Sequence, residues 1–140
     1  EDDIAVTVDR DWLALWQQRF TDPLLDAESL KLDRNHAILD IGRKVRAFNE
    51  IQAQYMGLLK FSSHGMQTFV KYCDSLGAAV EKLAMTDVLA GMIQSGSIVR
   101  GIPVSGGWLE FDGVDDLAAY ERLRQSKSLA RHFAVEDTDA

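Results

Sequence analysis

The sequence predicts an α/β fold in which helices flank a mixed β-sheet. Short runs of apolar and β-branched residues alternate along the chain with segments whose apolar residues recur at helical spacing, which is typical of strands layered against helices. Two of the runs are separated by only three polar residues, as in an antiparallel hairpin, so the sheet is expected to be mixed. With 140 residues, of which 46% are hydrophobic and 26% charged, the chain suits one domain with its own core.

The first expected elements are a strand and a helix. Residues 4–8 (Ile-Ala-Val-Thr-Val) form an apolar, β-branched run that suits a buried strand. Asp11 is a candidate cap for a helix that begins at Trp12, in which apolar residues recur as far as Arg19. Pro23 ends this helix, because the residue before a proline avoids the α region.

A hairpin and a long strand follow. Residues 29–33 and 37–42 alternate in polarity on either side of the polar residues 34–36, which predicts two half-buried strands joined by a turn. Residues 51–61 are expected to form a long central strand with Gly57 in its middle.

The remaining pattern predicts further helices and strands. In chain order they are a helix that begins at Ser62 or Ser63, a helix capped by Thr86 and ending at Gly96, strands at 97–104 and 108–112, and a last helix capped by Asp115 or Asp116. Leu117, Tyr120 and Leu123 share the apolar face of the last helix. After about Gln125 the pattern weakens, and residues 136–140 are expected to fray.

Charge and hydropathy exclude two classes of partner. The net charge of −7 does not suit a surface that gathers nucleic-acid phosphates. No run approaches the roughly 18–20 apolar residues that cross a bilayer, so we expect a soluble, cytoplasmic protein without nucleic-acid or membrane partners. The chain begins with Glu1 rather than Met, and a processed or truncated start is one interpretation. The single cysteine, Cys73, lies among apolar residues at helical spacing and is expected to be a buried, unreactive thiol.

The segment Gly106-Gly107-Trp108-Leu109-Glu110-Phe111-Asp112 carries the strongest chemical signal. If it is a strand, alternation places Trp108, Glu110 and Asp112 on one face, opposite two apolar residues. Paired carboxylates are ligands that suit Mg²⁺ when the ion also binds a substrate phosphate. The alternative is a solvated, acidic strand end.

Two further positions have both a ligand-binding and a structural interpretation. Gly57 inside a strand marks a bulge or a close approach of a ligand, and Tyr55 beside it could face that ligand; the alternative is tight packing under a helix. The turn that ends in Lys44 presents two cations to an anionic group such as a phosphate; the alternative is a solvated turn.

In order along the chain, these segments resemble a known family. They are Val8-Asp9-Arg10-Asp11-Trp12, Trp16 to Arg19, Asp22-Pro23-Leu24 with Asp26-Ala27-Glu28, Ile41-Gly42-Arg43-Lys44, Gln54-Tyr55-Met56-Gly57-Leu58-Leu59-Lys60-Phe61, Met85-Thr86-Asp87 and the 106–112 segment. The series resembles the C-terminal half of a bacterial nucleotidyltransferase of the phosphocholine cytidylyltransferase-like or sugar-phosphate nucleotidyltransferase family. The resemblance implies a Rossmann-like, GT-A-like α/β fold with a mixed sheet flanked by helices.

The resemblance also implies a reaction and a set of site residues. Such enzymes join CTP or another nucleoside triphosphate to a phosphorylated acceptor such as phosphocholine and release pyrophosphate, with Mg²⁺ held by two aspartates. By position, Asp112 is one metal ligand, and Lys44 is the catalytic lysine that contacts the acceptor phosphate. Tyr55 and Gly57 line the acceptor pocket in this comparison. Trp108 and Glu110 suit a cationic acceptor, through the indole face and the carboxylate.

The departures from the family pattern limit what this chain is expected to do alone. The glycine-rich G-x-G-x-R loop and the strand with the first metal-binding aspartate are missing. Residues 1–125 are therefore expected to form an acceptor-binding half without its nucleotide-binding half, followed by a tail at 126–140. The isolated chain is expected to be inactive.

Three interpretations stay open at the level of sequence. The chain is part of a cytidylyltransferase acting on phosphocholine, or the same chemistry acts on 2-aminoethylphosphonate or a sugar 1-phosphate. The third is a non-catalytic module that binds a ligand or a partner. An exposed sheet edge also predicts homo-oligomers or strand exchange.

Overall fold

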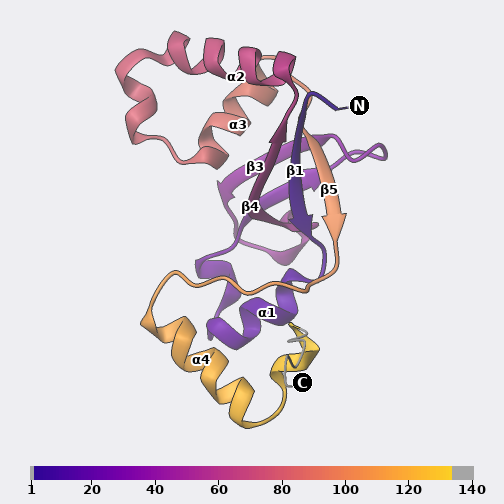
Figure 1. Cartoon of the computed structure of the whole chain (residues 1–140), viewed down its shortest axis with the longest axis vertical. Helices are drawn as coiled ribbons and strands as arrows, with labels where there is room; N and C mark the ends of the chain where they lie inside the picture. The colour runs from indigo at the N-terminus through magenta and orange to yellow at the C-terminus, as the bar shows by residue number, and fades with distance from the viewer. Residues whose placement is uncertain (1, 134–140) are drawn as a thin grey trace, which may run out of the picture.

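A computed structural model describes residues 2–133 and contains a mixed three-stranded sheet (Figure 1). Strand β1 (Ile4–Asp9) lies in the middle, antiparallel to β4 (Gln54–Phe61) and parallel to β5 (Arg100–Val104). The predicted α/β class with a mixed sheet is confirmed. The prediction that residues 51–61 form the central strand is wrong: β1, which is apolar and buried along most of its length, takes that position, and β4 lies at one edge.

The predicted hairpin forms a second, two-stranded sheet. Strands β2 (Glu28–Leu32) and β3 (Ile38–Lys44) pair antiparallel. Backbone hydrogen bonds attach the hairpin to the larger sheet: Ile38 N–H donates to the Val99 carbonyl at 2.9 Å, and Gly101 N–H donates to the His36 carbonyl at 2.8 Å.

Helices α2 (Ser63–Leu76) and α3 (Met85–Gln94) cover one end of the sheet (Figure 1). Ser62 caps α2 as predicted, because its hydroxyl accepts a hydrogen bond from Gly65 N–H at 3.0 Å. The predicted cap at Thr86 is wrong. Helix α3 begins one residue earlier, and the Asp87 carboxylate accepts from Ala84 N–H at 2.9 Å instead.

Helices α1 (Trp12–Arg19) and α4 (Val114–Gln125) lie together at the opposite end of the molecule (Figure 1). Asp11 occupies the N-cap position of α1 as predicted, although its side chain makes no capping hydrogen bond. The predicted caps of α4 at Asp115 or Asp116 are wrong. Gly113 is the capping residue, and Asp116, in the first turn, accepts from Gly113 N–H at 3.1 Å.

The described part of the chain has two hydrophobic cores. The first lies between the sheet, the hairpin and α3, and consists of Ile4, Val6, Val8, Leu30, Ile38, Ile41, Ala53, Val88, Leu89, Met92 and Val99. The second lies around α1 and consists of Trp12, Leu15, Trp16, Ala27, Val45, Ile51 and Tyr120. Leu123 packs against the second core as predicted, whereas Leu117 is exposed.

The predicted strand at 108–112 is absent: these residues form an irregular connection between β5 and α4. Gly106 and Gly107 both have positive φ angles, which turn the chain away from β5. Hydrogen bonds from side chains hold the segment in place of a strand ladder, as described below. Phe111 is exposed and packs its ring against Tyr120 at 4.8 Å between centroids.

Short 3-10 turns complete the structure. They are Pro23–Leu25, Phe48–Glu50, Gly77–Lys82 and Leu129–Arg131. The last of them packs back on the glycine turn, because Gly107 N–H donates to the His132 carbonyl at 3.1 Å. The predicted fraying of 136–140 lies outside the described residues. Among the helices that the structure describes, none has the length and apolar character to cross a membrane.

Candidate functional site

An acidic cavity of about 200 Å³ brings together three of the six predicted site residues, Tyr55, Glu110 and Asp112. It lies where the starts of β2 and β4 meet the irregular 105–113 connection and the end of α1. Its complete lining is Trp16, Asp26, Glu28, Gln54, Tyr55, Glu110 and Asp112. Four of these seven side chains are carboxylates, so the cavity suits a ligand with a positive charge.

Hydrogen bonds between the two sheets fix one wall of this cavity. The Gln54 amide donates to the Glu28 carbonyl at 2.6 Å, and Glu28 N–H donates to the Gln54 side-chain oxygen at 3.3 Å. Gln54 is buried, and Tyr55 next to it is half-buried. Burial raises the pKa of the Tyr55 phenol, so the phenol is protonated at neutral pH and can donate a hydrogen bond.

Arg19 holds the opposite wall. Its side chain is completely buried at the end of α1 and lies beneath Glu110 and Asp112. Separate Nη atoms of Arg19 donate to Glu110 Oε2 and Asp112 Oδ2, while Nε donates to Asp116 Oδ1 at 2.7 Å. Asp116 in turn accepts from Asp112 N–H at 2.8 Å. One guanidinium therefore ties two cavity carboxylates to helix α4.

Two of the cavity carboxylates, Glu110 and Glu28, carry charge at a cost. Burial raises the pKa of Glu110, and the nearby Arg19 opposes this effect only in part. Burial likewise raises the pKa of Glu28, although a hydrogen bond with Thr86 works in the other direction. A cation in the cavity would relieve this unfavourable accumulation of negative charge.

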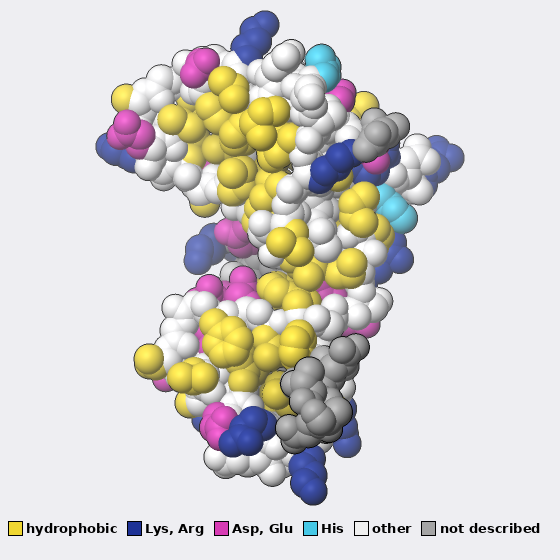
Figure 2. All heavy atoms as spheres, viewed as in Figure 1, with side chains coloured by type: hydrophobic (Ala, Val, Ile, Leu, Met, Phe, Trp, Pro, Cys, Tyr) yellow, Lys and Arg dark blue, Asp and Glu magenta, His cyan; other side chains and the backbone are white. Residues whose placement is uncertain are grey.

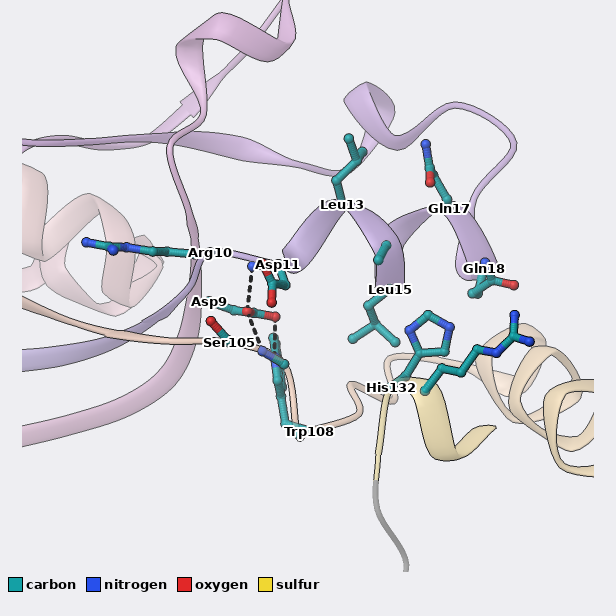
Figure 3. Close-up of a pocket in the computed structure, with 14 residues that line it drawn as sticks. Asp9, Arg10, Asp11, Leu13, Leu15, Gln17, Gln18, Ser105, Trp108 and His132 are labelled. Atoms are coloured by element: carbon teal, nitrogen blue, oxygen red, sulfur yellow. Dashed lines mark hydrogen bonds between the residues drawn. The ribbon is translucent and has the colours of Figure 1, made fainter. Parts of the chain in front are cut away.

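Trp108 does not line the acidic cavity. Its indole N–H donates to Asp9 Oδ2 at 2.9 Å, and the other oxygen of this buried carboxylate accepts from Gly106 N–H at 2.8 Å and Asp11 N–H at 2.9 Å (Figure 3). Figure 3 shows Trp108 on a separate cavity beside α1. The predicted grouping of Trp108 with Glu110 and Asp112 on one strand face is therefore wrong, because the segment is not a strand.

Lys44 and Gly57 lie near the acidic cavity without lining it. Lys44 ends β3 and is the strand partner of Glu28, whose side chain is in the lining. Gly57 has a φ of 77° and lies in a bulge of β4, where the pairing with β1 slips between Val6 and Val8. The bulge interpretation of Gly57 is confirmed, and a side chain added there would meet nothing within 4 Å.

The residues that sequence reasoning missed have recognisable signals. Asp26 and Glu28 flank Ala27 in an Asp-Ala-Glu segment directly after the Pro23 break, and both reach the cavity. Arg19 is the last residue of its helix, next to two aromatic rings, and its charge alone predicts an exposed side chain. Only the fold shows that the 105–113 connection closes over it.

Asp112 fits a magnesium ligand by chemistry and exposure. Its side chain is 64% exposed, and only one of its two carboxylate oxygens is bonded to Arg19. Hard oxygen donors suit Mg²⁺, which is commonly held by one or two carboxylates together with waters and substrate phosphates. Within residues 2–133 no three acidic, histidine or cysteine side chains gather as a complete metal site. Asp112 would therefore be a single protein ligand from the described part of the chain, of the kind that Mg²⁺ shares with waters and phosphates.

Cys73 is a free thiol at the far end of the molecule, on α2. It is partly rather than fully buried, which corrects the expectation of a buried residue. Burial raises its pKa, so the thiolate is disfavoured, in agreement with an unreactive cysteine.

Comparison with known proteins places this geometry in context. No protein-family model matches the sequence. The chain is 33% identical over 124 residues to a CTP:phosphoglutamine cytidylyltransferase from Campylobacter jejuni, a match that covers 84% of this chain and 49% of that protein. The chain is therefore related to nucleotidyltransferases, as expected, and it spans about half the length of this curated relative.

Solved structures agree on the fold. An inositol-1-phosphate CTP transferase from T. maritima superimposes with a TM-score of 0.56 at 18% identity, covering 96% of this chain and 49% of that one. A CMP:2-keto-3-deoxy-manno-octonic acid synthetase complexed with CTP gives a TM-score of 0.50 at 16% identity, covering 91% and 49%. The predicted nucleotidyltransferase-type α/β fold is confirmed.

Proposed function

Because the chain is related to a cytidylyltransferase and spans about half of its length, we propose that it is the acceptor-binding half of such an enzyme. The complete protein would transfer a cytidylyl group from CTP to a phosphorylated acceptor and release pyrophosphate. The observation that carries this proposal is the acidic cavity, which gathers Tyr55, Glu110 and Asp112 from separate segments of the chain.

The reaction is an in-line displacement at phosphorus. An oxygen of the acceptor phosphate attacks the α-phosphorus of CTP and forms a new phosphorus–oxygen bond, while the bond from the α-phosphorus to the bridging oxygen breaks and pyrophosphate leaves. The acceptor phosphate is already an anion at neutral pH, so no strong base is needed. The protein then acts mainly by positioning and by neutralising charge.

Each predicted site residue has a part in this scheme except Trp108. Asp112 would hold Mg²⁺, which neutralises charge on the reacting phosphates, and Lys44 would contact the acceptor phosphate from the rim. Tyr55 would donate a hydrogen bond from its phenol to the acceptor, and Gly57 would leave room beside it. Trp108 instead supports the cavity from outside through its bond to Asp9.

The lining of the cavity favours an acceptor with a primary ammonium group over one with a quaternary ammonium. A quaternary ammonium is best bound by several open aromatic faces, whereas a primary ammonium donates hydrogen bonds to carboxylates. The cavity offers carboxylates. Trp16 is only 3% exposed, and its ring is packed by Trp108 at 6.1 Å and by the Arg19 guanidinium at 5.0 Å. Phosphoethanolamine, 2-aminoethylphosphonate and phosphoglutamine are therefore better candidates than phosphocholine or a sugar 1-phosphate.

Titration calorimetry with Mg²⁺ present tests the proposal. Phosphoethanolamine should bind the chain more tightly than phosphocholine, and glucose 1-phosphate should bind most weakly. Glu110→Gln should weaken phosphoethanolamine binding by about tenfold, since a buried charge-assisted hydrogen bond contributes roughly 1.5–3 kcal/mol. Glu121→Gln, which changes a partly exposed carboxylate on α4 that pairs with Arg124 outside the cavity lining, is the matched control.

Two outcomes would count against the proposal. If none of the acceptors gives a binding signal, the chain has no acceptor site, and a non-catalytic module that binds a partner is favoured. Tighter binding of phosphocholine would keep the site but reverse the choice of acceptor. For the complete protein, pyrophosphate release from CTP should fall by at least about 100-fold in Asp112→Asn, as for other groups that stabilise charge in a transition state.

A further inference from the structure

Arg19 is the best-fixed cation in the described part of the chain. Four hydrogen bonds connect it to three carboxylates, with Nη2 also reaching Asp116 Oδ2 at 3.3 Å. The rings of Trp16 and Phe20 lie 5.0 and 4.9 Å from its Cζ atom. Burial alone would lower the pKa of Arg19, but its bonds to Asp116 and Asp112 outweigh burial, so the pKa is raised and the charge is permanent.

Two of the three carboxylates, those of Glu110 and Asp112, do not belong to a helix or a strand. Glu110 and Asp112 belong to the irregular 105–113 connection, where no strand ladder restricts their side chains. Arg19 comes from a different element and lies on the inner side of that connection. It binds one oxygen of Glu110 and one of Asp112, and both residues also line the acidic cavity. Each carboxylate is thus fixed by one oxygen while the other is left for a ligand.

From this geometry we infer that Arg19 is a positioning residue, which orients the free oxygens of Asp112 and Glu110 so that a divalent cation and the acceptor ammonium bind side by side. The inference rests on the proposed function, because it takes Asp112 as the metal ligand and Glu110 as the acceptor ligand. The planar fork of arginine suits this role because its donors have fixed directions, whereas the three donors of a lysine ammonium rotate about the Cε–Nζ bond.

Orientation and electrostatics predict opposite effects on metal binding. If Arg19 only adds positive charge near Asp112, its removal should strengthen the binding of a cation. If Arg19 orients Asp112, its removal should weaken that binding, because groups that orient metal ligands typically affect affinity by about 10–100-fold. Arg19→Gln removes the charge, and Arg19→Lys keeps it while removing the fork.

Paramagnetic broadening by Mn²⁺ measures the difference without any need for catalysis. Mn²⁺ prefers the same hard oxygen ligands as Mg²⁺ and detects weak sites by NMR. In the unmodified chain, the amide signals of Asp112 and Gly113 should broaden first. Both Arg19→Lys and Arg19→Gln should need about tenfold more Mn²⁺ for the same broadening. Arg43→Lys is the matched control, because Arg43 forms a similar fork with Asp40 at 2.6 and 2.8 Å outside the cavity.

Phe20→Leu keeps the test decisive if the Arg19 variants fail to fold. This change leaves every charge in place and loosens the packing of Phe20 against the guanidinium and the second core, so it should weaken Mn²⁺ binding in the same direction by a smaller factor. Unchanged binding in Arg19→Lys and Phe20→Leu, or stronger binding in Arg19→Gln, would overturn the positioning role. No broadening near Asp112 in the unmodified chain would instead overturn the metal ligand assignment, and with it the inference.

Discussion

Glu28 shows how a site carboxylate reduces the stability of the fold. Burial raises its pKa, so in the folded chain its ionised form is disfavoured relative to the unfolded chain. This unfavourable contribution is absent below the unfolded pKa, grows as the pH rises toward the folded pKa and is fully present above it. Glu28→Gln resembles the protonated form. We therefore expect its free energy of unfolding at pH 7 to be higher than that of the unmodified chain.

Urea unfolding at several pH values measures this effect. The advantage of Glu28→Gln should shrink as the pH falls and vanish below about pH 4, near the usual pKa of a glutamate. Glu81→Gln, at an exposed position, should show no such trend. The opposite slope, with the largest advantage in acid, would show that Glu28 is stabilised as an anion. The same substitution should weaken acceptor binding, since Glu28 lines the cavity.

Variants of Trp108 and Tyr55 should have contrasting effects, because we expect Trp108 to support the fold and Tyr55 to contact the acceptor. Trp108→Phe removes the donor to the buried Asp9 carboxylate, and the lost charge-assisted hydrogen bond should lower the free energy of unfolding by about 2 kcal/mol. Its effect on acceptor binding should be less than about twofold. Tyr55→Phe should do the reverse, with weaker acceptor binding and little change in stability. Titration calorimetry and urea unfolding of both variants measure these effects. A large loss of acceptor binding in Trp108→Phe would instead support the predicted role of Trp108 as a substrate contact.

At the scale of elements, helix α2 approaches the chain before β1 most closely at Gly65. A Cβ atom at Gly65 would lie 2.0 Å from the backbone carbonyl of Asp3, which cannot move without disturbing β1. Although alanine favours a helix over glycine by about 1 kcal/mol, Gly65→Ala should still destabilise the chain by about 2 kcal/mol. Gly91→Ala is the matched helical control. There the close atom is the tip of the Tyr72 side chain, which can rotate away, so the change should be near neutral in thermal unfolding.

The sequence predicted most elements because their signals are local. The buried run of β1, the polar turn of the hairpin and the serine cap of α2 each depend on a few neighbouring residues. The errors occurred where distant contacts decide. Residues 108–112 alternate like a strand, but two glycines with positive φ and side-chain bonds from Asp9 and Asp116 hold them in another conformation.

The candidate site was predictable to the same degree. Tyr55, Glu110 and Asp112 were found through motif resemblance, and the structure brings them into one cavity. The face that was expected to carry Trp108 with the two carboxylates required a strand that does not form. Arg19 could not be recognised, because its role depends on a chain segment about 90 positions away closing over it, and no local pattern reports such closure.

At the scale of the whole molecule, apolar side chains remain on the surface of both ends (Figure 2). Exposed large hydrophobic residues include Leu58, Met66, Val70, Ile98, Ile102, Phe111, Val114 and Leu117. Of these, Ile98 precedes β5 and Ile102 lies within it. Beyond Gly101, no strand of the described chain pairs with the outer edge of β5. An apolar edge strand is a template for pairing with another chain, and here Pro103, which lacks an N–H donor, limits the pairing to the remaining backbone groups of β5.

We therefore expect this chain to associate through the edge of β5 when it is studied alone. Light scattering over a range of concentrations should show dimers or larger species. Ile102→Lys should shift the chain toward monomer, because a lysine on an edge strand opposes pairing. Val114→Lys removes an equally apolar side chain from α4 and should leave the association unchanged. A monodisperse monomer at all concentrations would contradict the prediction, whereas loss of association only in Val114→Lys would move the interface to α4. If a polypeptide matching the other half of the relatives suppresses the self-association, the edge is the surface on which that half docks.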